Sequence, residues 1–338
     1  MVKFRASTGA AFSRIMSVGA YRPDRVVTNA EICEMIDSSD EWIRERSGIR
    51  ERRWAAPDQS VVDLACEAGR IAIERSGVAP EEIGLVLVAS VTHPYVTPSA
   101  SAEVSFRLGA LNAAATDISS ACAGFCYGIA LGDGAIRTGA AKYVLLIGVE
   151  KLSDWTSKTD RGTAFIFADG AGAVILGPSE EPAIGPVVWG AAGEQHEAIS
   201  MTQSFLAYRD HGGDFPTLTM QGQAVFRWAI GDMSKVAEEA LQAAGITSDD
   251  LDAFLPHQAN MRITDALVKA IKLPAHVPVA RDIEFTGNTS AASIPLAMDR
   301  MLSDGQIPYG GTALMIGFGA GLVYASQVVT LPPAPRHH

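Results

Sequence analysis

The chain has 338 residues, of which 48% are hydrophobic and 19% charged, and its formal net charge is −11. This balance predicts one large core or two halves, and the acidic charge argues against nucleic acid as the main partner. Four cysteines, Cys33, Cys66, Cys122 and Cys126, form no CxxC pair and no zinc pattern. We therefore expect free thiols, no metal site and the reducing cytoplasm, with neither a signal peptide nor a membrane span.

In chain order, residues 1–13 form an N-terminal extension, and the tail carries His337 and His338, too few histidines for a metal site. Residues 28–31, TNAE, fit a capping box. Residues 60–77 predict a helix that ends at a glycine, while 84–91 and 143–150 are short apolar runs typical of strands buried on both faces. Strands that alternate with helices predict a layered α/β protein.

The chain also repeats itself. Residues 72–89 resemble 240–257, with Gly77 and Gly245 separated by 168 positions, and 144–148 recur as 313–317 at an offset of 169. Each half also closes on a Gly-rich turn that leads into a strand, at 169–177 in the first half and 317–326 in the second. We therefore predict two βα-rich halves, 14–178 and 186–332, stacked as a pseudo-dimer with one crevice beyond the C-terminal strand ends.

The segment Asp117–Ala130, DISSACAGFCYGIA, puts Cys122 between a predicted strand and a predicted helix. This cysteine is either a small buried hydrophobe or a nucleophile whose thiolate the helix N-terminus favours. Its small neighbours would let a substrate approach the sulfur closely. Cys126, one turn later, is expected to pack inside, and Cys33 and Cys66 are expected to be structural.

Two polar segments of the second half fall near the same predicted crevice. His257 follows an apolar strand in LPHQAN, and Asn288 lies in TGNTSAASIP. Taken alone, His257 is a satisfied core group and Asn288 a turn residue, but so much polarity at a strand end needs a ligand or a hydrogen-bond network. The late GFGAG, 317–321, is no dinucleotide fingerprint, so we expect no cofactor; it could give a backbone N–H to an oxyanion.

Together, DISSACAGF, PHQAN, GNTSAASIP and GFGAG, with residues 38–52 and 160–176, resemble the ketoacyl-ACP synthase III family of the thiolase fold. The resemblance implies a layered αβαβα core of two pseudo-symmetric halves. It implies that Cys122 takes an acyl group from acyl-CoA, that malonyl-ACP is decarboxylated, and that His257 and Asn288 donate hydrogen bonds to the enolate. The backbone N–H groups of Cys122 and Ala320 would hold the oxyanion; many members have Gly at the second position.

The resemblance carries over binding residues as well. Trp42 and Arg161 match a pair that sandwiches the CoA adenine, and Arg46 matches a residue near the CoA phosphates. Asn260 matches a residue of the pantetheine tunnel; Phe226 and Phe318 match aromatics near the cysteine. Their alternative interpretations are a surface tryptophan, solvated arginines, a polar loop residue and core phenylalanines.

The partners follow from the same resemblance. In a homodimer, Thr97 would cross the interface to close the acyl pocket, and its small size leaves room for branched or longer primers. Acidic ACP needs a basic surface, for which Arg227, Arg262, Lys269 and Lys272 are candidates; we expect the last three near one helix face. The alternatives are an acyltransferase that uses a hydroxyl or amine acceptor without decarboxylation, and a non-catalytic acyl-CoA binder.

Overall fold

The structure, a computed structural model, describes residues 4–335 and is built around two separate β-sheets. His337, His338 and the first three residues of the predicted extension lie outside the described residues. Residues 4–10 form no helix or strand and are mostly exposed. The first strand begins at Phe12.

The first sheet has five strands in the order β1-β7-β6-β4-β5. Their bounds are β1 Phe12–Tyr21, β4 Ile83–Ala89, β5 Ala114–Ile118, β6 Tyr143–Lys151 and β7 Asp169–Ser179. The central strands β4 and β6 run parallel, as do β4 and β5. The two apolar runs predicted as buried strands are β4 and β6, which confirms that interpretation.

The second sheet has four strands in the order β11-β12-β13-β8. Their bounds are β8 Val188–Ala191, β11 Ala253–Pro256, β12 Thr312–Gly319 and β13 Val323–Thr330. β11 and β12 are parallel and aligned from Ala253 against Ala313, so the carboxyl end of β11 delivers the next residue, His257, to the same edge as the end of β12.

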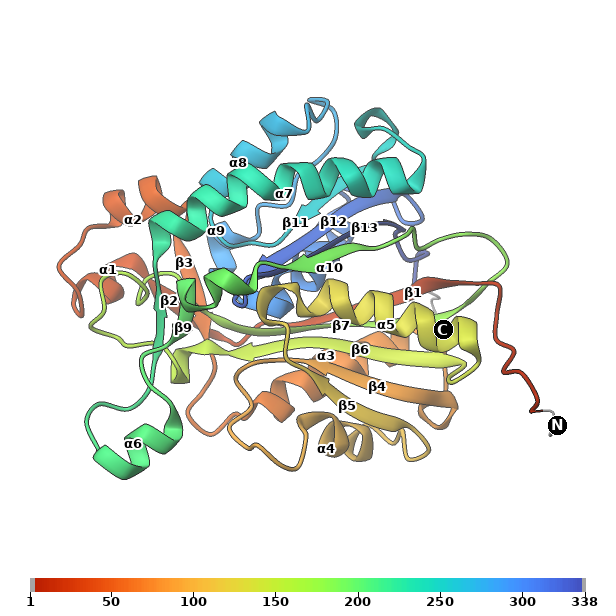
Figure 1. The fold of residues 1–338 in the computed structure, drawn as a ribbon, viewed down its shortest axis with the longest axis horizontal. Helices are drawn as coiled ribbons and strands as arrows, with labels where there is room; N and C mark the ends of the chain where they lie inside the picture. The colour runs from red at the N-terminus through yellow and green to blue at the C-terminus, as the bar shows by residue number, and fades with distance from the viewer. Residues whose placement is uncertain (1–3, 336–338) are drawn as a thin grey trace.

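Helices separate and cover the two sheets, which gives five layers (Figure 1). α3 (Val61–Ser76) and α4 (Ala100–Arg107) cover the outer face of the first sheet. α5 (Gly124–Thr138) and α10 (Ser293–Ser303) contact both sheets and form the middle layer. α7 (Gly222–Ala244) covers the second sheet, and α8 (Met261–Ala270) packs against α7. The αβαβα prediction is therefore confirmed.

The turns that lead into the two helices of the middle layer occupy equivalent positions in the two halves. A 3₁₀ turn, Ala121–Ala123, precedes α5, and another, Ser290–Ala292, precedes α10 at the same offset of 169 seen in the sequence. Both turns begin with a residue at positive φ, 43° at Ala121 and 48° at Ser290. The exact division at 14–178 and 186–332 stays a prediction.

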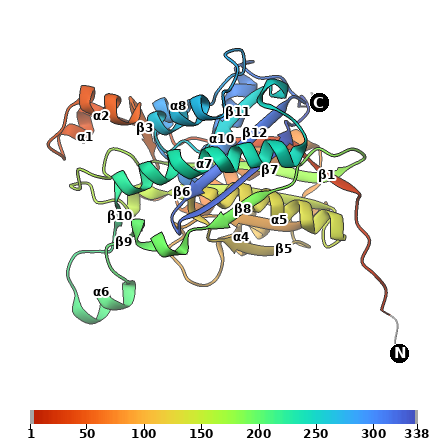
Figure 2. The same cartoon turned by 45° about the horizontal axis from the view of Figure 1, so that its top comes forward.

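The remaining elements decorate this core. They are β2 (Arg25–Thr28), α1 (Asn29–Cys33), α2 (Asp40–Ser47), β3 (Glu51–Trp54), β9 (Ile199–Met201), α6 (Phe205–His211), β10 (Leu218–Met220) and α9 (Ile283–Thr286). α6 stands out from the body beyond β9 and β10 (Figure 2). α1 and α2 lie beside the end of the molecule at which α7 starts (Figure 1).

Helix ends follow the sequence signals with one exception. Ser60 and Asp63 form a full capping box for α3, and Gly77 ends this helix in the left-handed region. At α1 the Thr28 hydroxyl accepts the Glu31 N–H at 3.3 Å, but the Glu31 carboxylate pairs with Arg25 instead of closing the box. The box predicted at 28–31 is therefore only half formed.

Candidate active site

Cys122 lies in the 3₁₀ turn between β5 and α5, as the sequence predicted for a strand-to-helix junction. The end of β12 packs directly against it. A Cβ on Gly319 would lie 2.9 Å from the Cys122 Sγ and 2.9 Å from its backbone N, so only glycine fits there without a shift. The Gly-rich segment of the second half thus touches the candidate nucleophile of the first.

Burial keeps the Cys122 thiol protonated. Desolvation raises its pKa to about 12, and a hydrogen bond with Ser290 only partly counteracts this effect. Of the two interpretations that the sequence left open, the thiolate favoured by the helix N-terminus is contradicted by this raised pKa. The loss of water around the sulfur outweighs the helix end, so the thiol must lose its proton during the reaction.

His257 follows the last residue of β11 and is 2% exposed. Its Nδ1 lies 2.7 Å from the Ser293 hydroxyl, which also accepts the Gln258 N–H at 3.3 Å. Desolvation lowers the pKa of His257 to about 3, so the imidazole is neutral. In the tautomer in which the Ser293 hydroxyl donates to Nδ1, the ring proton sits on Nε2 and can be donated.

Asn288 is held by backbone pairing to the segment before β7. Its N–H donates to the Ile166 carbonyl at 2.9 Å, and its carbonyl accepts the Ala168 N–H at 2.9 Å. The side-chain Oδ1 accepts the Ser290 N–H at 2.8 Å, which leaves the Nδ2 amide as the donor for a ligand. The preceding Gly287, at φ 67°, has no room for a Cβ, because one would lie 2.8 Å from the Arg52 Cβ.

These residues line one cavity of about 520 Å³, a size suited to a small-molecule site. Among the predicted site residues, its lining includes Cys122, His257, Asn288, Ala320, Trp42, Arg46, Asn260, Phe226, Phe318, Arg227 and Arg262. Thr97, Arg161, Lys269 and Lys272 are outside this lining. The structure therefore joins residues from both halves in one space, as the repeat indicated.

Aromatic and cationic side chains gather around Trp42 at the cavity. The Arg161 guanidinium lies 4.9 Å from the Trp42 ring centroid and that of Arg46 lies 5.9 Å from it. The Phe165 ring packs edge-on to Trp42 at 5.3 Å. Arg161 thus stacks on Trp42 directly, and a base sandwiched between them needs about 7 Å, two stacking distances, so this arrangement has to open to admit one.

Asn260 has a structural role that the sequence did not indicate. It is the N-cap of α8: its Oδ1 accepts the Arg262 N–H at 2.9 Å, and its Nδ2 donates to the Arg46 carbonyl at 2.9 Å. The side chain therefore ties α8 to α2 while it lines the cavity. Arg262 in turn lies over the Phe226 ring at 5.0 Å.

The predicted basic surface is only partly on one helix. Arg262 and Lys269 are exposed on α8, one on its first turn and one on its last. Lys272 lies beyond the end of α8 at φ 51°, so the expected common helix face of all three residues is wrong. The helix stops at Ala270, two residues short of Lys272. Arg227 is exposed on the first turns of α7.

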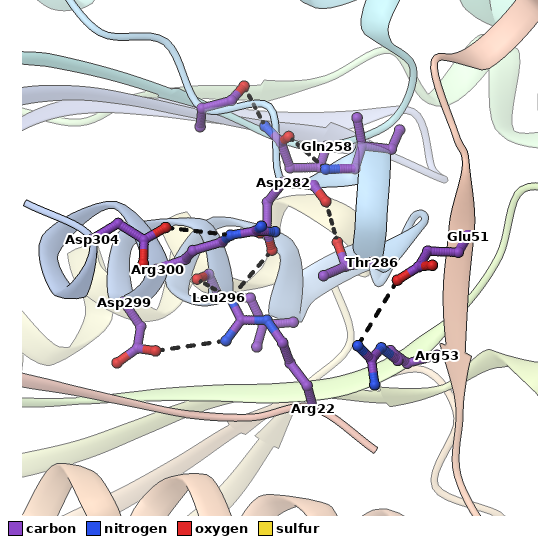
Figure 3. Close-up of polar contacts among 12 residues, drawn as sticks. Arg22, Glu51, Arg53, Gln258, Asp282, Thr286, Leu296, Asp299, Arg300 and Asp304 are labelled. Carbon is purple, nitrogen blue, oxygen red and sulfur yellow. Dashed lines mark hydrogen bonds and ion pairs between the residues drawn. The ribbon is translucent and has the colours of Figure 1, made fainter. Parts of the chain in front are cut away.

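Gln258, the residue after His257, lies beside a partly buried polar network around Asp282 (Figure 3). Gln258 Oε1 accepts the N–H of Ile283 at 3.1 Å. Asp282, one residue earlier, accepts from Arg22 at 3.3 Å and from Arg300 at 2.9 Å. Arg22 also donates to the Leu296 carbonyl at 2.7 Å, so the residue after β1 links the start of α9 to α10 (Figure 3).

Sequence reasoning missed Ser290, whose turn packs against that of Cys122, and Glu150, which accepts a hydrogen bond from Ser290. Glu150 ends the apolar run of β6 and is completely buried, and desolvation raises its pKa to about 7. The signal was present: a carboxylate at the carboxyl end of a strand buried on both faces is costly unless other groups pair or hydrogen-bond with it. Cys126 is fully buried, as expected.

Neither a metal-binding cluster nor a helix that could span a membrane occurs among the described residues. Within residues 4–335, no three His, Cys, Asp or Glu side chains are grouped so that they could share a metal ion. Over the same residues, no helix combines the length and apolar character needed to cross a bilayer.

A half-buried cysteine, a neutral histidine and an asparagine that line one cavity, in the layered fold described above, define a thiolase-fold condensing enzyme. Residues 116–193 match the family described as 3-oxoacyl-[acyl-carrier-protein (ACP)] synthase III, and residues 241–331 match its C-terminal domain. The chain is 56% identical to beta-ketoacyl-[acyl-carrier-protein] synthase III 1 of Streptomyces coelicolor, over 98% of this chain and 100% of that protein. It belongs to the beta-ketoacyl-ACP synthase III family, whose members are acyltransferases.

Solved structures agree. The priming beta-ketosynthase of the R1128 polyketide pathway superposes with a TM-score of 0.96 at 47% identity, covering 99% of this chain and 100% of that one. The 3-oxoacyl-[acyl-carrier-protein] synthase III of Aquifex aeolicus gives 0.86 at 35% identity, covering 94% and 99%. The membership and the fold expected from the motifs are thus confirmed.

Proposed function

We propose that this enzyme takes an acyl group from acyl-CoA onto Cys122 and condenses it with malonyl-ACP. The observation that carries the proposal is the meeting of Cys122, His257 and Asn288 in one cavity. In the first step Sγ attacks the thioester carbon, and CoA leaves with the thiol proton. The N–H groups of Cys122 and Ala320 would hold the oxyanion, a role supported by the close approach of Gly319 to Cys122.

In the second step malonyl-ACP loses CO₂, and its electron pair forms an enolate on the thioester. Two neutral donors, His257 Nε2 and Asn288 Nδ2, stabilise the oxygen where this charge develops. The enolate carbon attacks the acyl carbon on Cys122, the C–S bond breaks, and ketoacyl-ACP leaves. The low pKa of His257, about 3, supports this role because it keeps the imidazole neutral.

Two measurements test the proposal. Incubation with an acyl-CoA should add one acyl mass to the intact protein and none to Cys122→Ala, and labelled malonyl-ACP should then release CO₂. His257→Ala and Asn288→Ala should still acylate, but should release CO₂ about 10²–10³-fold more slowly. No adduct on Cys122 would indicate a non-catalytic binder, and acyl transfer without CO₂ release would indicate another acceptor.

For CoA we propose that Trp42 and Arg161 hold the adenine, that Arg46 contacts the phosphates, and that Asn260 lies along the pantetheine arm. The stacked Arg161 and Trp42 support the first assignment. Phe226 and Phe318 would border the acyl chain; the Phe318 ring packs edge-on to His257 at 5.4 Å.

We further propose a homodimer paired through β5. β5 is an edge strand of the first sheet, and an unpaired edge favours association with another strand. Large apolar side chains near it are exposed, among them Phe106, Leu111 and Tyr95. Thr97, on the exposed loop before α4, would then reach the partner's acyl pocket. Light scattering should give about twice the chain mass of 35.7 kDa.

For the acyl carrier protein we propose docking at the cavity side of α7 and α8, where Arg227 and Arg262 both line the cavity. Lys269 and Lys272 would extend this surface away from the cavity. Charge reversal of Lys269, which is exposed and outside the cavity lining, should raise KM for malonyl-ACP, most strongly at low salt, and should leave acylation by acyl-CoA nearly unchanged.

A further inference from the structure

Glu150 is a buried carboxylate that the proposed chemistry does not use. Its Oε2 accepts three hydrogen bonds, from Thr92 Oγ1 at 2.7 Å, Val91 N at 3.1 Å and Ser90 Oγ at 3.2 Å. Its Oε1 accepts one, from the Ser290 hydroxyl at 3.1 Å. The two oxygens therefore differ: Oε2 is held by donors of the loop after β4, whereas Oε1 faces the site.

Ser290 connects this carboxylate to the sulfur. The residue is 3% exposed, its 3₁₀ turn packs against the turn that carries Cys122, and both residues line the cavity. The Ser290 hydroxyl lowers the pKa of the thiol, although desolvation outweighs this effect. The positive φ of Ser290, 48°, turns the start of the 3₁₀ turn so that its N–H reaches the Asn288 side chain. One residue thus contacts the candidate nucleophile, the buried carboxylate and an enolate donor.

The other neighbours of Glu150 leave its charge unpaired. Ser90, Val91 and Thr92 are neutral, and Cys122 is the titratable group on the facing turn. In the described part of the chain, no cation forms an ion pair with Glu150. The adjacent Lys151 bonds elsewhere, to the Gln59 carbonyl at 2.8 Å and to Asp154 at 3.2 Å.

We propose that Ser290 and Glu150 receive the proton of Cys122 when the thiol is acylated. The proton of Sγ passes to the Ser290 oxygen while the Ser290 hydroxyl proton passes to Glu150 Oε1. The sulfur electron pair forms the new C–S bond, the bond to the CoA sulfur breaks, and the proton returns through Ser290 to the departing CoA thiolate. Ser290 is then a further catalytic residue, and Glu150 is a positioning residue that acts through it.

The chemistry needs such an acceptor. Desolvation raises the pKa of the thiol and keeps it protonated, and His257, with a pKa of about 3, is too weak a base to take its proton. Glu150, whose pKa burial raises to about 7, is matched to this task near neutral pH. This proposal rests on the proposed function, because it gives Cys122 the acyl-transfer role.

The test uses alkylation of Cys122 by iodoacetamide, followed by peptide mass, over pH 5–9. This readout needs neither acyl-CoA nor malonyl-ACP, so it fails independently of the proposed function. In the wild type the rate should rise with ionisation of Glu150 and level off above about pH 7. In Glu150→Gln and Ser290→Ala the plateau should vanish, and the rate at pH 8 should fall at least tenfold, on the order of general-base effects.

The variants are chosen to fold. A glutamine can accept the three loop donors with its oxygen and donate to the Ser290 oxygen with its nitrogen. The matched control is Asp169→Asn, which removes another buried carboxylate, one bonded to Ser153 and the Ala55 N–H and not to Ser290. Asp169→Asn should keep the wild-type plateau in the alkylation rate above about pH 7. Glu150→Asp, which restores a carboxylate, should regain an inflection in the pH profile of the alkylation rate.

The double variant, Glu150→Gln with Ser290→Ala, should be no slower than the slower single variant, because both remove the same path. Wild-type rates and inflection in either single variant would overturn the proposal. So would an equal loss of the plateau in Asp169→Asn, because the effect would then follow from buried charge in general.

Discussion

Gly319→Ala tests how tightly the two halves position the candidate nucleophile. The added Cβ would lie 2.8 Å from the Cys122 Cβ and 2.9 Å from its Sγ and N, whereas carbon contacts prefer about 3.5–4.0 Å. Cys122 or β12 must therefore move by about 0.5 Å or more. Since a displacement near 1 Å can cost about 100-fold in rate, we expect self-acylation to slow by roughly tenfold.

The assay is the intact-protein mass followed in time after mixing with acyl-CoA. Overpacking should also lower the free energy of unfolding by about 1–3 kcal/mol. Gly134→Ala is the control: it lies on α5, the helix that follows Cys122, and a Cβ there meets no atom within 4 Å. It should acylate normally and gain about 0.5–1 kcal/mol of stability. Wild-type acylation by Gly319→Ala would refute the reasoning.

Three other outcomes are expected. Trp42→Ala should raise KM for acyl-CoA about tenfold with little change in kcat, checked by steady-state kinetics; an unchanged KM would contradict the adenine assignment. Arg52→Met should lower the free energy of unfolding in urea by about 3 kcal/mol or more, because it leaves the Asn29 Oδ1 and Phe165 carbonyl acceptors without their buried guanidinium. Because burial lowers the pKa of His257 to about 3 from 6.5, the unfolded chain binds a proton there that the folded chain does not, and stability falls as pH drops from 6.5 toward 3. His257→Gln should remove a loss of up to roughly 5 kcal/mol over that range, seen in urea titrations at several pH values; equal pH dependence in both proteins would contradict it.

The sequence predicted the buried strands, the helix ends and the internal repeat, because each of these features depends on residues close together in the chain. The apolar runs became β4 and β6, Ser60 and Gly77 bounded α3 as their cap chemistry requires, and the offset of 169 recurred in the paired 3₁₀ turns. Backbone conformation and helix capping depend on residues a few positions apart. The repeat then implied that two strand ends meet in one crevice.

Only the tertiary structure determined the solvation and the protonation state of the site residues. The sequence left Cys122 as either a buried hydrophobe or a thiolate at a helix end. In the fold the end of β12 and the turn before α10 pack against its turn, and desolvation of the sulfur raises the pKa of the thiol. In the sequence Glu150 is the polar residue that ends an apolar strand. In the structure it is buried beside Ser290, 140 positions away in the sequence. The solvation and charge of a titratable side chain depend on every segment that packs around it. Many of these segments are distant in the sequence, so the local spacing of residues does not predict them.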